Sequence, residues 1–197
     1  MGALRPFFTF VIGMGALRPF FYFMRYFMNR KVRRLVYGAI ITALYATLTH
    51  LQNILLPGSA TMAIQFRASE ALCVLAFFTP AAIPGLAIGC LVFNLTFAMA
   101  LPLDFLVGSL ASLLAAWGIW ATRKVTIKGF PLLGLLMPAL SNALLVGWEL
   151  TVYIGGGFGL NALYVAIGEA AVLLTLGTAL YYAIKRRRLA GRLFRNA

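Results

Sequence analysis

The chain has 197 residues, of which 62% are hydrophobic and only 11% are charged. A soluble domain usually carries about 25% charged residues, so this composition excludes an ordinary soluble protein. The net charge of +13 would indicate a nucleic-acid partner in a soluble chain, but here the basic residues lie outside apolar stretches. Because these stretches reach about 20 residues, the length that crosses a bilayer, the sequence predicts an all-α integral membrane protein without a nucleic-acid partner.

The first 29 residues form a segment of their own. The sequence MGALRPFF at positions 1–8 recurs at positions 14–21, and arginine and proline residues interrupt the apolar runs. We expect an N-terminal extension outside the folded core, with Met24 or Met28 as alternative starts. The other interpretation is an aromatic, basic segment that lies on the inner membrane surface.

Six apolar blocks follow and predict six transmembrane helices, at residues 35–56, 69–78, 81–101, 105–121, 130–154 and 161–184. The second block reaches only about 15 Å as an α-helix, so it predicts a partial span. The proline-rich stretch 79–85 predicts a tight turn. The chain therefore divides into the extension, a membrane domain over residues 30–188 and a basic tail over residues 189–197.

Three clusters of basic residues predict the orientation. They precede the first block, separate the fourth from the fifth, and follow the sixth: Arg30, Lys31, Arg33 and Arg34; Arg123, Lys124 and Lys128; and residues 185–188. Basic residues favour the cytoplasmic side, so six spans place both termini in the cytoplasm. One span fewer or more would put at least one cluster outside.

This topology places every acidic residue in the outer half of the membrane. Ionisable groups in a bilayer normally face a bundle interior, where they bind a ligand or one another. Asn142 and Glu149 are seven residues apart and so share one helical face. We predict a polar pocket that opens outward and is formed by Glu70, Asp104, Glu149, Glu169, Arg67, Asn94 and Asn142.

Local structural roles are the alternative for the same residues. Glu70 could pair with Arg67 three residues away, and Asp104 could cap the fourth helix. Glu149 and Glu169 could lie at the membrane interface, and the two asparagines could join helices by hydrogen bonds. The residues alone leave both interpretations open.

Motifs for catalysis or ATP hydrolysis are missing from the sequence. It has no GxxxxGK[ST] loop to bind phosphates and no HExxH or GxSxG motif, so we expect neither an enzyme nor a cofactor. His50 is the only histidine, and we expect it to be a satisfied group near the interface. Cys73 and Cys90 lack metal-ligand spacing and are expected to be free, buried thiols.

Four segments carry a family resemblance: IQFRASEAL at 64–72, PGLAIGCLVFN at 84–94, PALSNALLVGWEL at 138–150 and LNALYVAIGEAAV at 160–172. Through them, residues 32–188 resemble the queuosine-precursor transporter (QueT) family of S components of energy-coupling factor (ECF) transporters. The resemblance implies a six-helix S-component bundle in a bacterial plasma membrane. It also implies docking onto a transmembrane T protein with two ABC ATPases, which would hydrolyse ATP.

The ligand that the resemblance implies is a 7-deazaguanine precursor of queuosine, in its aminomethyl or cyano form. A carboxylate can accept both adjacent N–H groups of a guanine-like edge, and a second carboxylate can pair with the ammonium of the aminomethyl form. We assign these roles to Glu149 and Glu169 in either order, with the two asparagines completing the polar edge. Three aromatic residues either stack on the ring or anchor the helix ends: Trp148, Tyr153 and Tyr164.

Two further features concern access and docking. The loop over residues 57–68 covers the site in the family, and we predict that an Arg67–Glu70 interaction orders it as a lid. The glycines at 155–157 and 159 provide a second flexible connection. Family members dock through small residues on the first helix, and Ala39 and Ala43 match this spacing, although simple helix packing explains it equally.

Three other functions remain compatible with the sequence. The chain could be an S component for another heteroaromatic vitamin such as thiamine. It could be a self-sufficient channel or facilitator, which would transport solute without ATPase partners. A purely structural membrane protein would bind no ligand, and the acidic cluster argues against it.

Overall fold

A computed structural model describes residues 29–57, 59, 66–98 and 100–186. Within these residues the chain forms helices and no strand. The elements in chain order are α2 (Arg30–Leu55), η1 (Ala68–Phe77), α3 (Ala82–Thr96), α4 (Asp104–Thr122), α5 (Leu132–Leu135), α6 (Met137–Tyr153), α7 (Phe158–Val172), η2 (Leu173–Gly177) and α8 (Thr178–Arg186). The segment η1 is a 3-10 helix and η2 is a short π-helical stretch. The predicted all-α fold is therefore confirmed.

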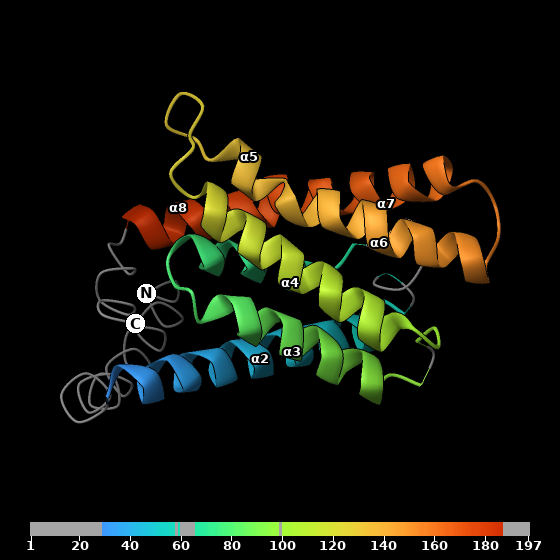
Figure 1. Cartoon of the computed structure of the whole chain (residues 1–197), viewed down its shortest axis with the longest axis horizontal. Coiled ribbons are helices and arrows are strands. Elements are labelled where there is room, and N and C mark those ends of the chain that lie inside the picture. The colour runs from blue at the N-terminus through green and yellow to red at the C-terminus, as the bar shows by residue number, and fades with distance from the viewer. Residues whose placement is uncertain (1–28, 58, 60–65, 99, 187–197) are drawn as a thin grey trace, which may run out of the picture.

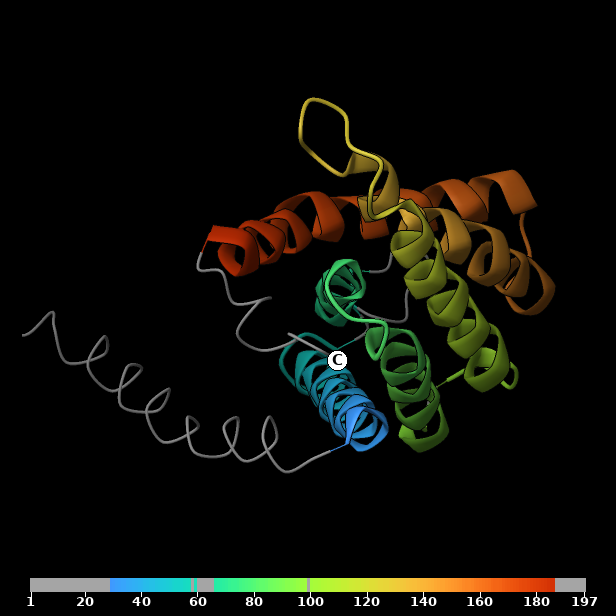
Figure 2. The ribbon, with the colours of Figure 1, turned by 60° about the vertical axis from the view of Figure 1, so that its left-hand side comes forward.

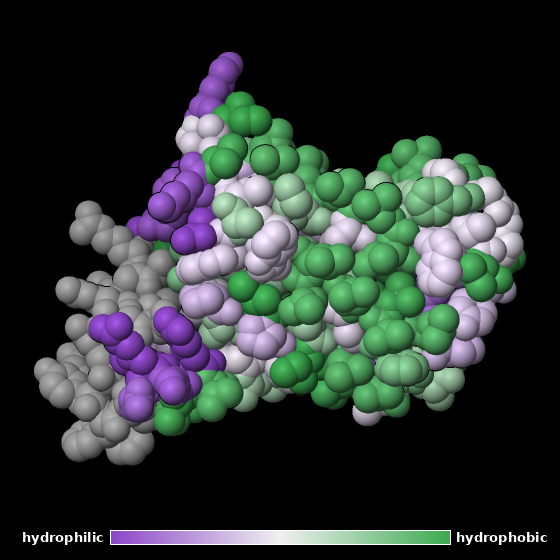
Figure 3. All heavy atoms as spheres, viewed as in Figure 1, coloured by the Kyte–Doolittle hydropathy of each residue, from purple (hydrophilic) through white to green (hydrophobic). Residues whose placement is uncertain are grey.

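Four helical stretches of the described chain are long and apolar enough to cross a membrane: Arg30–Leu55, Asp104–Thr122, Leu132–Tyr153 and Phe158–Arg186. The apolar segments η1 and α3 are shorter, with 10 and 15 residues. Figure 3 shows apolar side chains over the middle of the molecule and hydrophilic side chains gathered at one end. The chain is a multi-pass membrane protein, and each of the six apolar blocks forms helix.

The helix ends differ from the predicted boundaries for local reasons. Helix α2 begins five residues before its apolar block, because the Asn29 side chain caps it by accepting a hydrogen bond from the Lys31 amide at 3.3 Å. The predicted turn over residues 79–85 is wrong in its second half, since α3 already begins at Ala82. Pro84 fits there because N–H groups in a first helical turn have no partner within the helix.

The last two apolar blocks are not uniform helices. The block at 130–154 is divided at Leu136 into the single turn of α5 and the longer α6. The block at 161–184 continues through α7, η2 and α8, with a π-helical stretch of five residues in the middle. Both blocks are therefore helical, as predicted, but neither forms one uninterrupted α-helix.

The short helix η1 occupies the centre of the bundle. It contacts α2, α3, α4, α7, η2 and α8, and Figure 2 shows it enclosed by its neighbours. A 3-10 helix has three residues per turn, so Glu70, Cys73 and Ala76 stack in one row, and all three are buried. The second block is therefore short, as predicted, and it carries its acidic residue into the middle of the protein.

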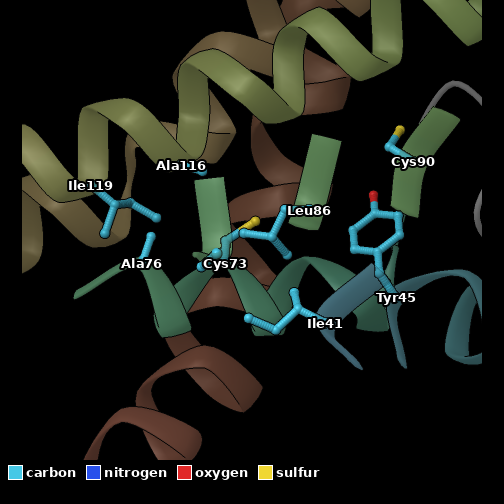
Figure 4. Packing of buried hydrophobic residues seen from close by; sticks show 9 residues of the cluster. Ile41, Tyr45, Cys73, Ala76, Leu86, Cys90, Ala116 and Ile119 are labelled. Atoms are coloured by element: carbon cyan, nitrogen blue, oxygen red, sulfur yellow. The ribbon is translucent and has the colours of Figure 1, made fainter. Parts of the chain in front are cut away.

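Helices α2 and α3 pack with their backbones in close contact. A Cβ atom on Gly85 would lie 2.8 Å from the Gly38 carbonyl oxygen, and one on Gly89 would lie 2.7 Å from the Cβ of Tyr45. Only glycine allows this approach, which fixes Tyr45 in the core. Figure 4 shows the surrounding cluster, which joins α2, η1, α3 and α4 through Ile41, Tyr45, Cys73, Ala76, Leu86, Cys90, Ala116 and Ile119.

The three basic clusters lie at one end of the bundle. Figure 1 places the start of α2, the loop after α4 and the end of α8 at this end, which we call the basic end. It includes Arg30, Lys31 and Arg34, the loop residues 123–128, and Lys185 with Arg186. Residues 1–28 of the predicted extension (1–29) and the tail at 189–197 lie outside the described residues, whereas Asn29 caps α2.

Candidate functional site: a buried acidic cluster

The four acidic residues of the chain converge inside the bundle, in the half away from the basic end. They come from η1, α4, α6 and α7, and each is at most 7% exposed: Glu70, Asp104, Glu149 and Glu169. Figure 1 shows that α4 begins and α6 ends at the end of the bundle opposite the start of α2. We call these four residues, together with Arg67, the acidic cluster.

Arg67 occupies the centre of the acidic cluster. It immediately precedes η1, is only 3% exposed, and interacts electrostatically with all four carboxyl groups, those of Glu70, Asp104, Glu149 and Glu169. Buried charges are costly unless they are paired, so the guanidinium compensates part of this acidic surrounding. The four carboxyl groups outnumber the single guanidinium, so acidic groups predominate in the cluster.

Glu70 is held by hydrogen bonds within the protein. The Tyr45 hydroxyl donates to its Oε1, and the Cys73 thiol donates to its Oε2 at 3.1 Å. One turn along α2 from Tyr45, Thr49 donates to the Ser69 hydroxyl at 2.7 Å. Glu70 therefore joins η1 to α2, in addition to its electrostatic interaction with the arginine three residues earlier.

Asp104 fixes the connection between α3 and α4. Its Oδ2 accepts a hydrogen bond from the Leu101 amide at 3.2 Å, and its carbonyl oxygen accepts one from the Asn94 side chain at 2.7 Å. The N-cap residue of α4 is Leu103, so the alternative of a side-chain cap by Asp104 is wrong. For Asn94, the alternative of an interhelical hydrogen bond is confirmed.

Glu149 and Glu169 are the exceptional members of the acidic cluster. They are 0% and 1% exposed, and none of their carboxyl oxygens has a hydrogen-bond partner among the described residues. Their burial excludes an exposed interfacial position. Buried polar groups in proteins are nearly always hydrogen-bonded, so these two carboxyl groups differ from Glu70 and Asp104 in the same cluster.

The surroundings of this pair link it to the rest of the predicted site. Glu149 interacts electrostatically with Asp104, and Glu169 interacts with Glu70 and with the buried Asn142. Helices α6 and α7 approach closely, since a Cβ on Gly147 would lie 2.8 Å from the Cα of Ala162. The structure thus brings all seven predicted site residues to one region, although several of them also have structural contacts.

The aromatic residues near the helix ends are placed differently. Trp148 and Tyr153 are 49% and 40% exposed, which fits interfacial anchors, and Tyr164 is half-buried. His50 pairs with the Thr96 hydroxyl at 2.8 Å, so the prediction of a satisfied histidine is confirmed. The two cysteines are free and buried, as predicted.

The sequence reasoning missed the contribution of α2. Besides Tyr45 and Thr49, the same helix provides Gln52, whose Nε2 donates to Ser59 at 2.8 Å and to the Phe66 carbonyl, while its Oε1 accepts from the Ala68 amide at 2.7 Å. Gln52 therefore ties both sides of segment 60–65, which lies outside the described residues. The available signal was a polar stripe at helical spacing within an apolar span.

The fold is that of a multi-pass helical membrane protein with a cluster of buried polar groups in its interior. No group of side chains suited to holding a metal ion occurs in the described part of the chain. The sequence model of the QueT transporter family matches residues 35–186, so the chain belongs to the QueT transporter family. It is therefore a membrane transport protein and not a catalytic enzyme. No match was found among curated proteins or among solved structures.

Proposed function

We propose that this chain is the substrate-binding S component of an ECF importer and that it captures a 7-deazaguanine precursor of queuosine from outside the cell. The observation that carries the proposal is the pair of buried, orphaned carboxyl groups on Glu149 and Glu169 beside Arg67. Membership of the QueT transporter family supports the class of substrate.

The chemistry of the ligand fits this pair. A guanine-like edge offers two adjacent N–H donors to one carboxylate, and the ammonium of the aminomethyl form offers a charge-assisted hydrogen bond to the other. Asn142 lies near Glu169, and Asn94 retains an unpaired Oδ1 that can accept a further hydrogen bond. A cationic ligand would also reduce the excess of acidic groups around Arg67.

The proposed topology follows from the positions of the charges. The basic end faces the cytoplasm of a bacterium, with both termini inside, and the acidic cluster opens toward the outside. In this arrangement η1 and α3 complete six membrane segments. The predicted lid, the loop over residues 57–68, lies mostly outside the described residues, and Gln52 binds the backbone at Phe66 and Ala68 beside it. Ala39 and Ala43 are exposed on α2 and provide the docking face for a T protein with two ABC ATPases.

Calorimetric titration of the purified full chain in detergent tests the proposal. The panel contains the aminomethyl and cyano 7-deazaguanines, guanine and thiamine. We expect saturable one-to-one binding of a deazaguanine, with the aminomethyl form the tightest because only it carries an ammonium. Preferential binding of thiamine would support an S component for another vitamin, and binding of no panel member would refute the proposed substrate.

Transport measurements separate the import mechanism from the substrate. Vesicles that contain the chain alone should bind the ligand without accumulating it, because the chain has no phosphate-binding loop. Uptake should require the T protein, both ATPases and ATP. Uptake by the chain alone would favour a channel or facilitator.

A further inference from the structure

A groove between α2 and α3 lies at the basic end, away from the acidic cluster. It has a volume of about 700 Å³, and its lining includes Lys31 and Arg34 near the start of α2. Beyond these two cations the lining is mostly apolar and includes Leu35, Pro84 and Ile88. The groove thus combines a positively charged mouth with an apolar interior.

The polar groups inside the groove are already satisfied or absent. Thr42, which lines the far end, donates its hydroxyl to the Gly85 carbonyl oxygen at 2.9 Å. The remaining lining beyond the two cations consists of aliphatic residues, proline and glycine. A polar solute would lose hydration there without compensation, whereas a hydrocarbon chain would not.

The length of the groove matches one leaflet of a membrane. Its lining on α2 runs from Lys31 to Thr42, which corresponds to about 16 Å of helix. Half of the hydrocarbon core of a bilayer is about 15 Å thick. With its cations at the headgroup level, the groove therefore extends about as deep as one acyl chain.

We propose that this groove binds an anionic phospholipid, with the phosphate at Lys31 and Arg34 and an acyl chain along the apolar lining. Complementary charge favours this occupant over a zwitterionic lipid, because each basic residue near a membrane surface attracts anionic headgroups. A second copy of the chain is disfavoured, since it would bring the same cations together. The groove lining includes Ala39, which the proposed function also places on the docking face, so the lipid and the T protein would occupy this part of α2 alternately. The inference goes beyond the proposed function and does not depend on the ligand of the acidic cluster.

Native mass spectrometry of the full chain in detergent tests the charged part of the site. The probes are phosphatidylglycerol, phosphatidylcholine with the same acyl chains, and inorganic phosphate. We expect one phosphatidylglycerol to bind about tenfold more tightly than phosphatidylcholine, and the double variant Lys31→Gln/Arg34→Gln to remove this preference. The control Lys124→Gln/Lys128→Gln removes the same charge from the loop after α4, outside the groove lining, and should keep the preference.

A second pair of variants tests the apolar part. Ile88→Trp fills the groove at a residue that is 48% exposed, whereas Val92→Trp lies one turn further along α3, is 38% exposed and does not line the groove. Only Ile88→Trp should weaken binding of both lipids. The proposal would be overturned if both charge variants lost the preference for phosphatidylglycerol equally, or if the two lipids bound equally well to the unchanged chain. It would also be overturned if inorganic phosphate bound as tightly as lipid, or if the chain formed a dimer without lipid.

Discussion

Replacing Glu149 or Glu169 by glutamine should weaken ligand binding without weakening the fold. Glutamine keeps the shape of the side chain but removes its charge and one acceptor oxygen. These carboxyl oxygens have no hydrogen-bond partner among the described residues, so the substitution breaks no such bond. A neutral amide is also less costly to bury than a carboxylate. The thermal unfolding temperature should therefore stay the same or rise.

The loss of affinity follows from the bond that the ligand would make. A hydrogen bond to a charged group contributes about 1.5 to 3 kcal/mol, which corresponds to a roughly 10- to 150-fold weaker dissociation constant for each substitution. Calorimetry with the aminomethyl deazaguanine measures this change, and a thermal unfolding scan in the same detergent measures stability.

Glu70→Gln is the matched control, because it makes the same chemical change at a carboxylate that Tyr45 and Cys73 already satisfy. One of these donors would then face an amide N–H group, at a cost of about 1 to 3 kcal/mol of stability. For a chain of this size, that loss lowers the unfolding temperature by roughly 2 to 10 °C. Wild-type affinity in both the Glu149 and Glu169 variants, or a stability loss like that of the control, would refute the reasoning.

Three further experiments test the packing, the buried network and the docking face. Gly89→Ala places a methyl group 2.7 Å from the Tyr45 Cβ and should cost about 1 to 3 kcal/mol in thermal unfolding, whereas Gly159→Ala, which meets nothing within 4 Å, should not destabilise. Tyr45→Phe removes a donor to the acidic cluster and should lower the unfolding temperature by several °C; an unchanged temperature would contradict the hydrogen bond. The double variant Ala39→Leu/Ala43→Leu should abolish ATP-dependent uptake by the reconstituted transporter, while calorimetry should show unchanged ligand affinity. Normal uptake by this variant would argue against docking of the T protein at Ala39 and Ala43.

Sequence patterns predicted the helices well because long apolar segments in a membrane have few structural options. Backbone N–H and C=O groups in lipid must be satisfied within the chain, so an apolar block becomes a helix. The boundaries were less predictable, since they depend on local groups such as the Asn29 side chain that caps α2. The 3-10 conformation of η1 was also not predictable, because many contacts at the centre of the bundle act on it.

The sequence selected seven residues for the candidate site because charged and amide groups are rare and costly inside a membrane protein. The structure brings them to one region, and their role in binding stays a prediction. Their partners were not identifiable, since Tyr45 on α2 and Glu70 on η1 meet only when the bundle closes around η1. The sequence therefore could not distinguish Glu70, which accepts two hydrogen bonds, from Glu149 and Glu169, whose carboxyl oxygens accept none from the described residues.

By itself, the sequence determined that this protein is a helical membrane protein and that it resembles QueT family members, and it selected the few acidic residues as candidates for a site. These properties follow from composition and from residues that are near one another in the chain. The tertiary structure alone decided which carboxyl groups accept hydrogen bonds from the protein, because hydrogen bonds between α2, η1, α3 and α4 join residues that are separated in the sequence. The same is true of the groove at the basic end, which forms only where α2 and α3 lie side by side.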